Sequence, residues 1–146
     1  MRKLIIFLYL VAMNTHASNW ESLVYGNWEV TRIIPTKGIS ALSQAEAETF
    51  VHSKFSYSKS EATYNKISCN SPKFKIVKTS EEQFFDGFYN TFAELGISDD
   101  FTYSVNVNCS DNNSDWFIGS FLYTKDINHL IVFIEGVFFE LEKVKT

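Results

Sequence analysis

The run Phe101-Thr-Tyr-Ser-Val-Asn-Val-Asn108 decides the fold class of this chain of 146 residues. Aromatic or aliphatic residues stand at every second position from Phe101 to Val107, and hydroxyl or amide residues stand between them. Successive side chains of a β-strand point to opposite faces of a sheet, so this alternation is typical of a strand with one buried face. The pattern alone therefore predicts a half-buried strand over 101–108.

Short apolar-patterned runs continue on both sides of this strand and are separated by turn residues. They cover residues 27–34, 54–59, 62–68, 73–79, 116–123, 130–134 and 137–144. One face of the first run carries, at a spacing of two, Trp28, Val30, Arg32 and Ile34. Eight short antiparallel strands bury an interior either as a barrel or as a sandwich. We expect a closed eight-stranded barrel, because closure removes exposed edges and leaves room for one small ligand.

Two helices are expected among these strands, and each begins with a capping box. Ser43-Gln-Ala-Glu46 predicts a short helix over 44–52, and Ser80-Glu-Glu-Gln83 predicts an amphipathic helix over 81–95, between the fourth and fifth strands. One face of the second helix carries an apolar stripe of Phe84, Phe88, Phe92 and Leu95. We interpret this stripe as packing against the barrel; the alternative is a face that binds lipid or a partner.

The first 17 residues have the order of a secretory signal. Basic Arg2 and Lys3 precede an apolar run over 4–13, which is too short to span a bilayer, and small or polar residues follow. The alternative is a buried helix or strand at the N-terminus. We expect export to the periplasm or medium with no stable membrane anchor, and a single domain over 18–146 with 11 basic against 17 acidic residues, a net charge of −6. This acidic balance gives no footprint for nucleic acid.

Export changes the interpretation of the two cysteines, because thiols pair in an oxidising compartment. Cys69 and Cys109 are the only two in the chain, so we expect a structural disulfide between them. Metal or redox chemistry is the alternative, but the 40-residue separation lacks the close spacing of such sites.

Both ends of this domain resemble lipocalins and the wider calycin group. Gly26-Asn27-Trp28 at the start of the first strand is similar to the Gly-x-Trp signature of these barrels, and residues 136–143 look like their last strand. The resemblance implies that Trp28 closes one end of the barrel and that Lys143 lies across its ring, a cation–π contact worth about 0.5–2 kcal/mol. Lipocalins carry their long helix after the eighth strand and usually Arg in place of this Lys, and this chain differs in both respects.

The sequence offers little for catalysis. His52 and His129 are the only histidines of the domain, and we interpret both as surface residues. The paired acids, Glu140 and Glu142 among them, stand at positions that look exposed, and no phosphate loop, metalloprotease or nucleophile-elbow motif is present. We expect no enzyme activity, no metal and no cofactor. The lysines at 66, 73, 75 and 78 form the one local basic cluster. We interpret it as the solvated outer face of a strand; the alternative is a surface for an acidic partner.

Two functions from different classes follow from these expectations. The first is a non-enzymatic carrier that holds a small apolar or amphipathic molecule inside the barrel. Its expected ligand-binding residues are Phe55, Tyr57, Tyr103, Val105 and Phe121. The alternative is a protein-binding inhibitor or immunity factor that acts on a secreted hydrolase or toxin in the cell envelope, since a small, rigid, acidic domain suits that role. The oligomeric state is left open.

Overall fold

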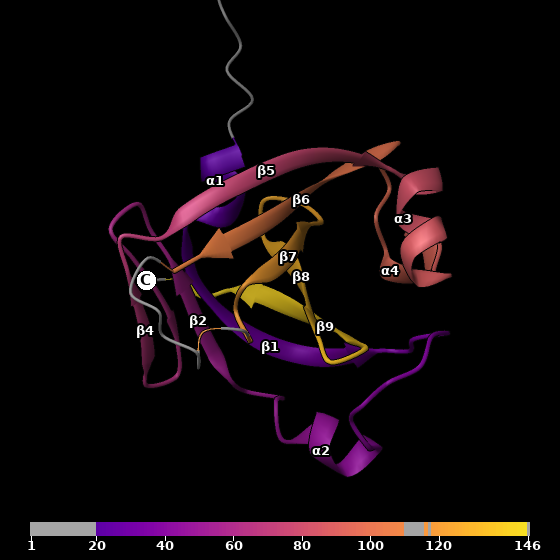
Figure 1. Cartoon of the computed structure of the whole chain (residues 1–146), viewed down its shortest axis with the longest axis horizontal. Coiled ribbons are helices and arrows are strands. Elements are labelled where there is room, and N and C mark those ends of the chain that lie inside the picture. The colour runs from indigo at the N-terminus through magenta and orange to yellow at the C-terminus, as the bar shows by residue number, and fades with distance from the viewer. Residues whose placement is uncertain (1–19, 110–115, 117, 146) are drawn as a thin grey trace, which may run out of the picture.

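The computed structural model describes residues 20–109, 116 and 118–145 (Figure 1). The predicted signal segment over 1–17 lies outside the described residues, as does the turn over 111–115. Within the described ranges, no helix is long and apolar enough to cross a membrane.

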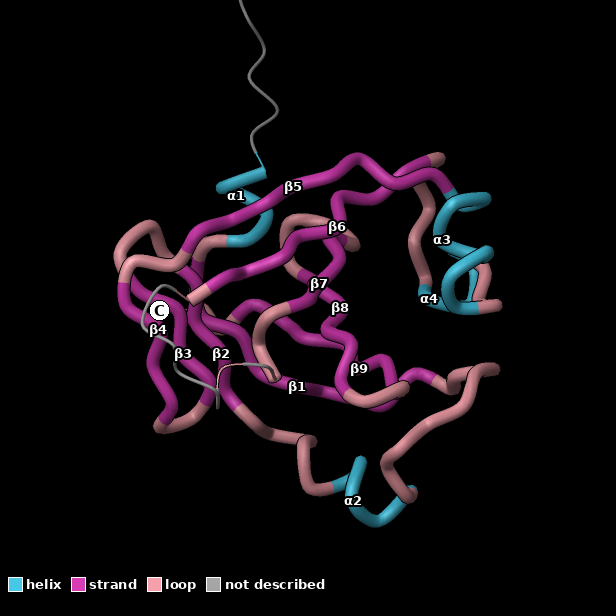
Figure 2. The backbone as a smooth tube through the Cα atoms, in the orientation of Figure 1, coloured by secondary structure: helices cyan, strands magenta, loops and turns pink. Residues whose placement is uncertain are grey.

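Within the part of the chain that the structure describes, one antiparallel sheet of nine strands is the dominant element, which confirms the mainly-β prediction. Its strands are β1 (Gly26–Ile34), β2 (Lys54–Tyr57), β3 (Glu61–Tyr64), β4 (Ile67–Asn70), β5 (Lys73–Ser80), β6 (Phe101–Asn108), β7 (Phe121–Thr124), β8 (His129–Ile134) and β9 (Val137–Lys143). Their order in the sheet is β4-β3-β2-β1-β9-β8-β7-β6-β5. The sheet curls into a half-barrel (Figures 1 and 2).

The structure has nine strands where the sequence predicted eight, because the run over 62–68 folds back on itself. Asn65 takes a left-handed conformation, with φ 49°, and its side-chain oxygen accepts a hydrogen bond from the Lys54 backbone at 3.0 Å. A tight turn therefore separates β3 from β4.

The half-barrel replaces the closed barrel of the prediction. No ladder between described residues joins the edge strands β4 and β5. The predicted disulfide is confirmed and bridges this open side, since Cys69 lies on β4 and Cys109 directly follows β6, the neighbour of β5. The disulfide thus connects the two edge regions of the sheet on the side where a closed barrel would have backbone hydrogen bonds between strands.

A β-bulge changes the face that the second half of β1 presents. The pairing of β1 with β9 shifts register between Val30 and Arg32, so Trp28 and Val30 face the inner core while Ile34 joins a core on the outer face. The expectation that Trp28, Val30, Arg32 and Ile34 share one face was therefore wrong. An extra residue in one strand reverses the alternation beyond it.

Two cores lie on opposite faces of the sheet. The inner core draws on every strand of the sheet, and its largest buried side chains include Trp28, Phe55, Tyr57 and Phe139. The outer core lies between β7–β9 and two helices, α3 (Glu81–Phe88) and α4 (Phe92–Leu95), with Phe84 and Phe138 in contact at 5.7 Å between ring centroids. The C-terminal strands are therefore apolar on both faces.

The helices keep the predicted starts but are shorter. The capping boxes at Ser43 and Ser80 form as expected, yet α2 covers only Gln44–Glu48. The helix predicted over 81–95 is broken, because Tyr89 takes a left-handed conformation and Thr91 caps a new helix, α4. A further short helix, α1 (Trp20–Val24), precedes β1.

Candidate functional site

Four of the five residues expected to bind a ligand meet in the inner core. Phe55, Tyr57 and Val105 are buried there, and Tyr103, which is half-buried, packs against this core. The Tyr57 hydroxyl donates a hydrogen bond to the Gly119 carbonyl oxygen at 3.1 Å, and burial raises the pKa of Tyr57. These side chains are engaged in packing and hydrogen bonding with their neighbours.

Phe121, the fifth expected ligand residue, lies on the other face of the sheet. It pairs with Asn106 in the ladder between β6 and β7 and packs against the outer core. The predicted strand over 116–123 begins only at Phe121, so the sequence pattern did not settle its face. The structure does not bring Phe121 to the other four.

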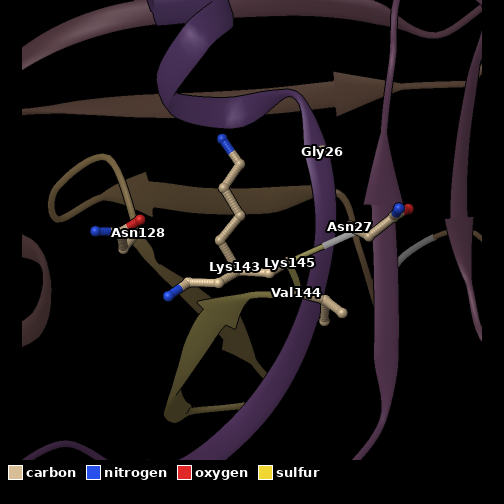
Figure 3. Close-up of a pocket in the computed structure, with 6 residues that line it drawn as sticks. All are labelled: Gly26, Asn27, Asn128, Lys143, Val144 and Lys145. Atoms are coloured by element: carbon tan, nitrogen blue, oxygen red, sulfur yellow. The ribbon is translucent and has the colours of Figure 1, made fainter.

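The structure brings Gly26, Trp28 and Lys143 together at one end of the half-barrel. The Lys143 ammonium lies 5.0 Å from the centroid of the Trp28 ring and donates a hydrogen bond to the Ser22 carbonyl oxygen of α1 at 3.2 Å. The Trp28 indole N–H donates to the Val24 carbonyl oxygen at 2.9 Å. Figure 3 shows the Lys143 side chain running toward α1 past Gly26, where a Cβ would come 2.7 Å from Lys143 Cε.

A hollow of about 500 Å³ opens at this end of the sheet and is lined by Asn27, Asn128, Lys145 and their neighbours (Figure 3). Its best-placed cation, Lys143, is already held by Trp28 and Ser22. The geometry therefore favours a structural role for Lys143, which connects α1 to Trp28, over a ligand-binding role for the hollow.

The two histidines each lie beside one acid. His52 Nδ1 is 3.0 Å from Glu29 Oε1, and His129 Nδ1 is 2.9 Å from Asp126 Oδ1. His52 is exposed and His129 is half-buried at a strand end. Among the described residues, no three of the His, Cys, Asp and Glu side chains lie together as metal ligands would.

Glu140 is buried, which corrects the expectation that it is exposed. Arg32 donates two hydrogen bonds to its carboxylate, at 2.9 and 3.0 Å, and the Lys125 ammonium contacts it as well. Burial alone would raise the pKa of Glu140, but the bonds from Arg32 and Lys125 outweigh it and hold this pKa below its usual range. Because Arg32 and Lys125 both pair with the Glu140 carboxylate, we interpret these three residues as a structural ion cluster.

A groove of about 410 Å³ lies on the outer face, beside the C-terminal end of α3. Residues of the loop after β1, of α3 and its cap, and of the β8–β9 hairpin line it, namely Thr36, Gly38, Ile39, Gly87, Phe88, Tyr89, Phe133 and Gly136. Figure 2 shows this loop running out on the side of the molecule where α3 and α4 lie. The outer core supplies the floor, because Phe88 and Phe133 belong to it and contact each other at 4.8 Å between ring centroids.

Hydrogen bonds fix the loop wall of the groove at two points. Asn90, which is buried, donates to the Pro35 carbonyl oxygen at 3.2 Å and accepts from the Lys37 backbone at 3.3 Å. At the other side, the Ala41 N–H donates to the Glu135 carbonyl oxygen at 2.9 Å. The short stretch between these anchors presents Ile39, a residue that is 98% exposed.

Tyr89 lies at the opposite wall of the groove, in a backbone conformation that is unfavourable for tyrosine. Its φ is 60°, the left-handed region where glycine or asparagine usually caps a helix, yet the residue is a tyrosine with 60% of its surface exposed. Phe85, 42% exposed, lies 6.2 Å from it between ring centroids. Strained backbone together with exposed apolar side chains is characteristic of binding sites.

Sequence reasoning missed this groove. It assigned the stripe of Phe84, Phe88, Phe92 and Leu95 to the core, and Phe84 and Phe88 do pack in the outer core, but it gave no separate role to Phe85 or Tyr89. Ile39 stands between Gly38 and Ser40, in the segment that joins the first predicted strand to the first predicted helix, and a lone apolar residue there was the available signal.

Comparison of the chain with protein-family models, with curated proteins and with solved structures gives no match. The fold and the site therefore define the molecule only as a mainly-β half-barrel with an apolar groove on its outer face. Its likeness to lipocalins stays a prediction from the sequence.

Proposed function

We propose that this chain is an exported, non-enzymatic protein-binding domain, of the inhibitor or immunity-factor type, that recognises its partner through the outer groove. The observation that carries the proposal is the exposure of Ile39 and Tyr89, which line a preformed apolar groove, together with that of Phe85, which contacts Tyr89. The disulfide is compatible with an exported protein.

The loop wall of the groove is held in place by hydrogen bonds, which supports its use as a rigid binding surface for a protein. Asn90 holds the loop on one side and the Ala41–Glu135 hydrogen bond holds it on the other, so little conformational entropy is lost on binding. Exposed aromatic and aliphatic side chains around a shallow hollow are the usual centre of a protein interface.

The carrier with a ligand inside the barrel stays a prediction. The packing of Phe55, Tyr57 and Val105 in the inner core gives it no support. A native mass spectrum of the purified protein separates the two functions: we expect the mass of the bare chain, and a stoichiometric small adduct that is lost on denaturation would favour the carrier.

The test of the proposed function uses Tyr89→Gly, which removes the side chain from the groove at a backbone conformation that glycine prefers. Immobilised wild-type domain and Tyr89→Gly are exposed to envelope and secreted fractions of the source organism, and retained proteins are quantified by mass spectrometry. We expect a protein that the wild type retains stoichiometrically and that Tyr89→Gly retains at least tenfold less.

His52→Gly is the matched control, because His52 also has a positive φ, 71°, and is exposed but does not line the groove. It should retain the same protein as the wild type. Equal retention by Tyr89→Gly, or no specific retention by the wild type, would contradict the proposal.

A further inference from the structure

The charges beside the groove indicate which chemistry the partner presents. We infer that the groove receives one apolar side chain that lysine or arginine residues flank on an exposed segment of the partner. This inference rests on the proposed function and adds the chemical class of the partner's contact segment.

The shape of the groove favours a single side chain on an exposed main chain. Three of its lining residues are glycines, Gly38, Gly87 and Gly136, and a Cβ added at Gly38 or Gly87 would meet no atom within 4 Å. A partner backbone can therefore come close to both walls. Its side chain would reach Phe88 and Phe133 on the floor, where apolar contact is available.

Exposed carboxylates stand next to the lining residues on two elements. Asp86 directly precedes Gly87 on α3, and Glu135 directly precedes Gly136 in the β8–β9 turn. Within the described ranges, no lysine, arginine or histidine forms an ion pair with either. Glu82 adds a third exposed acid one turn before Asp86 on the same helix.

The single cation of the loop wall does not offset these acids. The ammonium of Lys37 is paired with the carboxylate of Glu94, and that contact, with the Thr91 backbone bond, lowers the pKa of Glu94. The surroundings of the groove are thus apolar at the centre and negative at the edge, and a complementary segment is apolar at its centre with positive flanks.

Selective labelling with ¹⁵N-glycine makes the test specific. The chain has six glycines, of which Gly38, Gly87 and Gly136 line the groove, whereas Gly26, Gly96 and Gly119 do not. The folded domain is titrated with three capped peptides, Lys-Lys-Phe-Lys-Lys, Glu-Glu-Phe-Glu-Glu and Lys-Lys-Ser-Lys-Lys, and the glycine amide shifts are recorded.

We expect Lys-Lys-Phe-Lys-Lys to move only the three groove glycines and to bind about fivefold more tightly than either other peptide, with the charge advantage lost in 1 M salt. Equal binding of the Glu-flanked peptide would overturn the inference and leave the proposed function standing. Equal binding of the serine peptide would overturn the apolar anchor. Shifts at Gly26, Gly96 or Gly119, or no shifts with any peptide, would overturn the assignment to this groove, while the retention experiment decides the proposed function separately.

Discussion

Tyr89 is the residue at which stability and recognition conflict. A non-glycine residue in the left-handed region costs about 1–2 kcal/mol, and the side chain of Tyr89 is too exposed to recover much of this by burial. We therefore expect Tyr89→Gly to raise the free energy of unfolding by about 1 kcal/mol while it weakens partner binding. Urea denaturation measures the free energy of unfolding of the variant. A value below that of the wild type would contradict the claim that the backbone is strained at Tyr89.

Glu140 governs a pH-dependent part of the stability. Its pKa is lowered in the folded state, so its contribution is fully present above the usual pKa of a glutamate and is lost as the pH falls through the lower, folded value. We expect Glu140→Gln to cost about 2 kcal/mol at pH 7, because it leaves Lys125 with little solvent and no counter-charge. At pH 3 the difference in the free energy of unfolding between this variant and the wild type should be smaller, because the stabilising charge of Glu140 is being lost there.

Denaturation curves at both pH values check this expectation, with Glu142→Gln as the control on the same strand, since Glu142 is exposed. A difference that stayed constant with pH would show that the cost comes from packing and not from the charge. The spacing of two along β9 puts Glu140 and Glu142 on one face and Phe139 and Leu141 on the other, where they join the inner core. It could not show that Lys125 and Arg32 close over one acid of the pair, because that contact joins distant segments.

At the scale of elements, the loop after β1 depends on the absence of a side chain at Gly136. This residue has a φ of 91°, and a Cβ there would lie 2.5 Å from the Ile39 carbonyl oxygen and 2.7 Å from the Ser40 Cα. We expect Gly136→Ala to cost about 1–3 kcal/mol and to displace the loop wall of the groove. The Gly38 amide shift reports the displacement.

Gly87→Ala provides the contrast within the same groove. Its Cβ would meet no atom within 4 Å, and alanine is the better helix former, so this change should stabilise α3 by about 0.5–1 kcal/mol. If Gly136→Ala left both stability and the Gly38 shift unchanged, the contact between hairpin and loop would not be fixed as described.

The elements show where local pattern suffices and where it does not. Capping boxes and strict alternation correctly located β6 and the starts of α2 and α3, because these signals lie within a few residues. The bulge in β1 was not predictable, since it is set by the pairing with β9. The break at Tyr89 did have a local signal, because Thr91-Phe-Ala-Glu94 is a third capping box, and the sequence analysis did not use it. The groove forms at the break and for that reason escaped the sequence analysis.

For the whole molecule, the disulfide is the link across the open side of the half-barrel. Replacing Cys69 and Cys109 together by alanine should lower the free energy of unfolding by up to about 4 kcal/mol on the chain-entropy account of a loop of this length. Hydrogen exchange should accelerate first in the edge hairpin β3–β4 and least in β8 and β9, which lie between other strands. Uniform acceleration in all strands would contradict this role.

The central claim is that the molecule recognises a protein through the outer groove, and site-specific photocrosslinking in the exporting organism tests it most directly. A benzophenone amino acid replaces Ile39 in one variant and Ile127, which is exposed but does not line the groove, in another. We predict a covalent adduct with one partner protein from position 39 and none from position 127. No adduct from position 39, or the same adducts from both positions, would contradict the account.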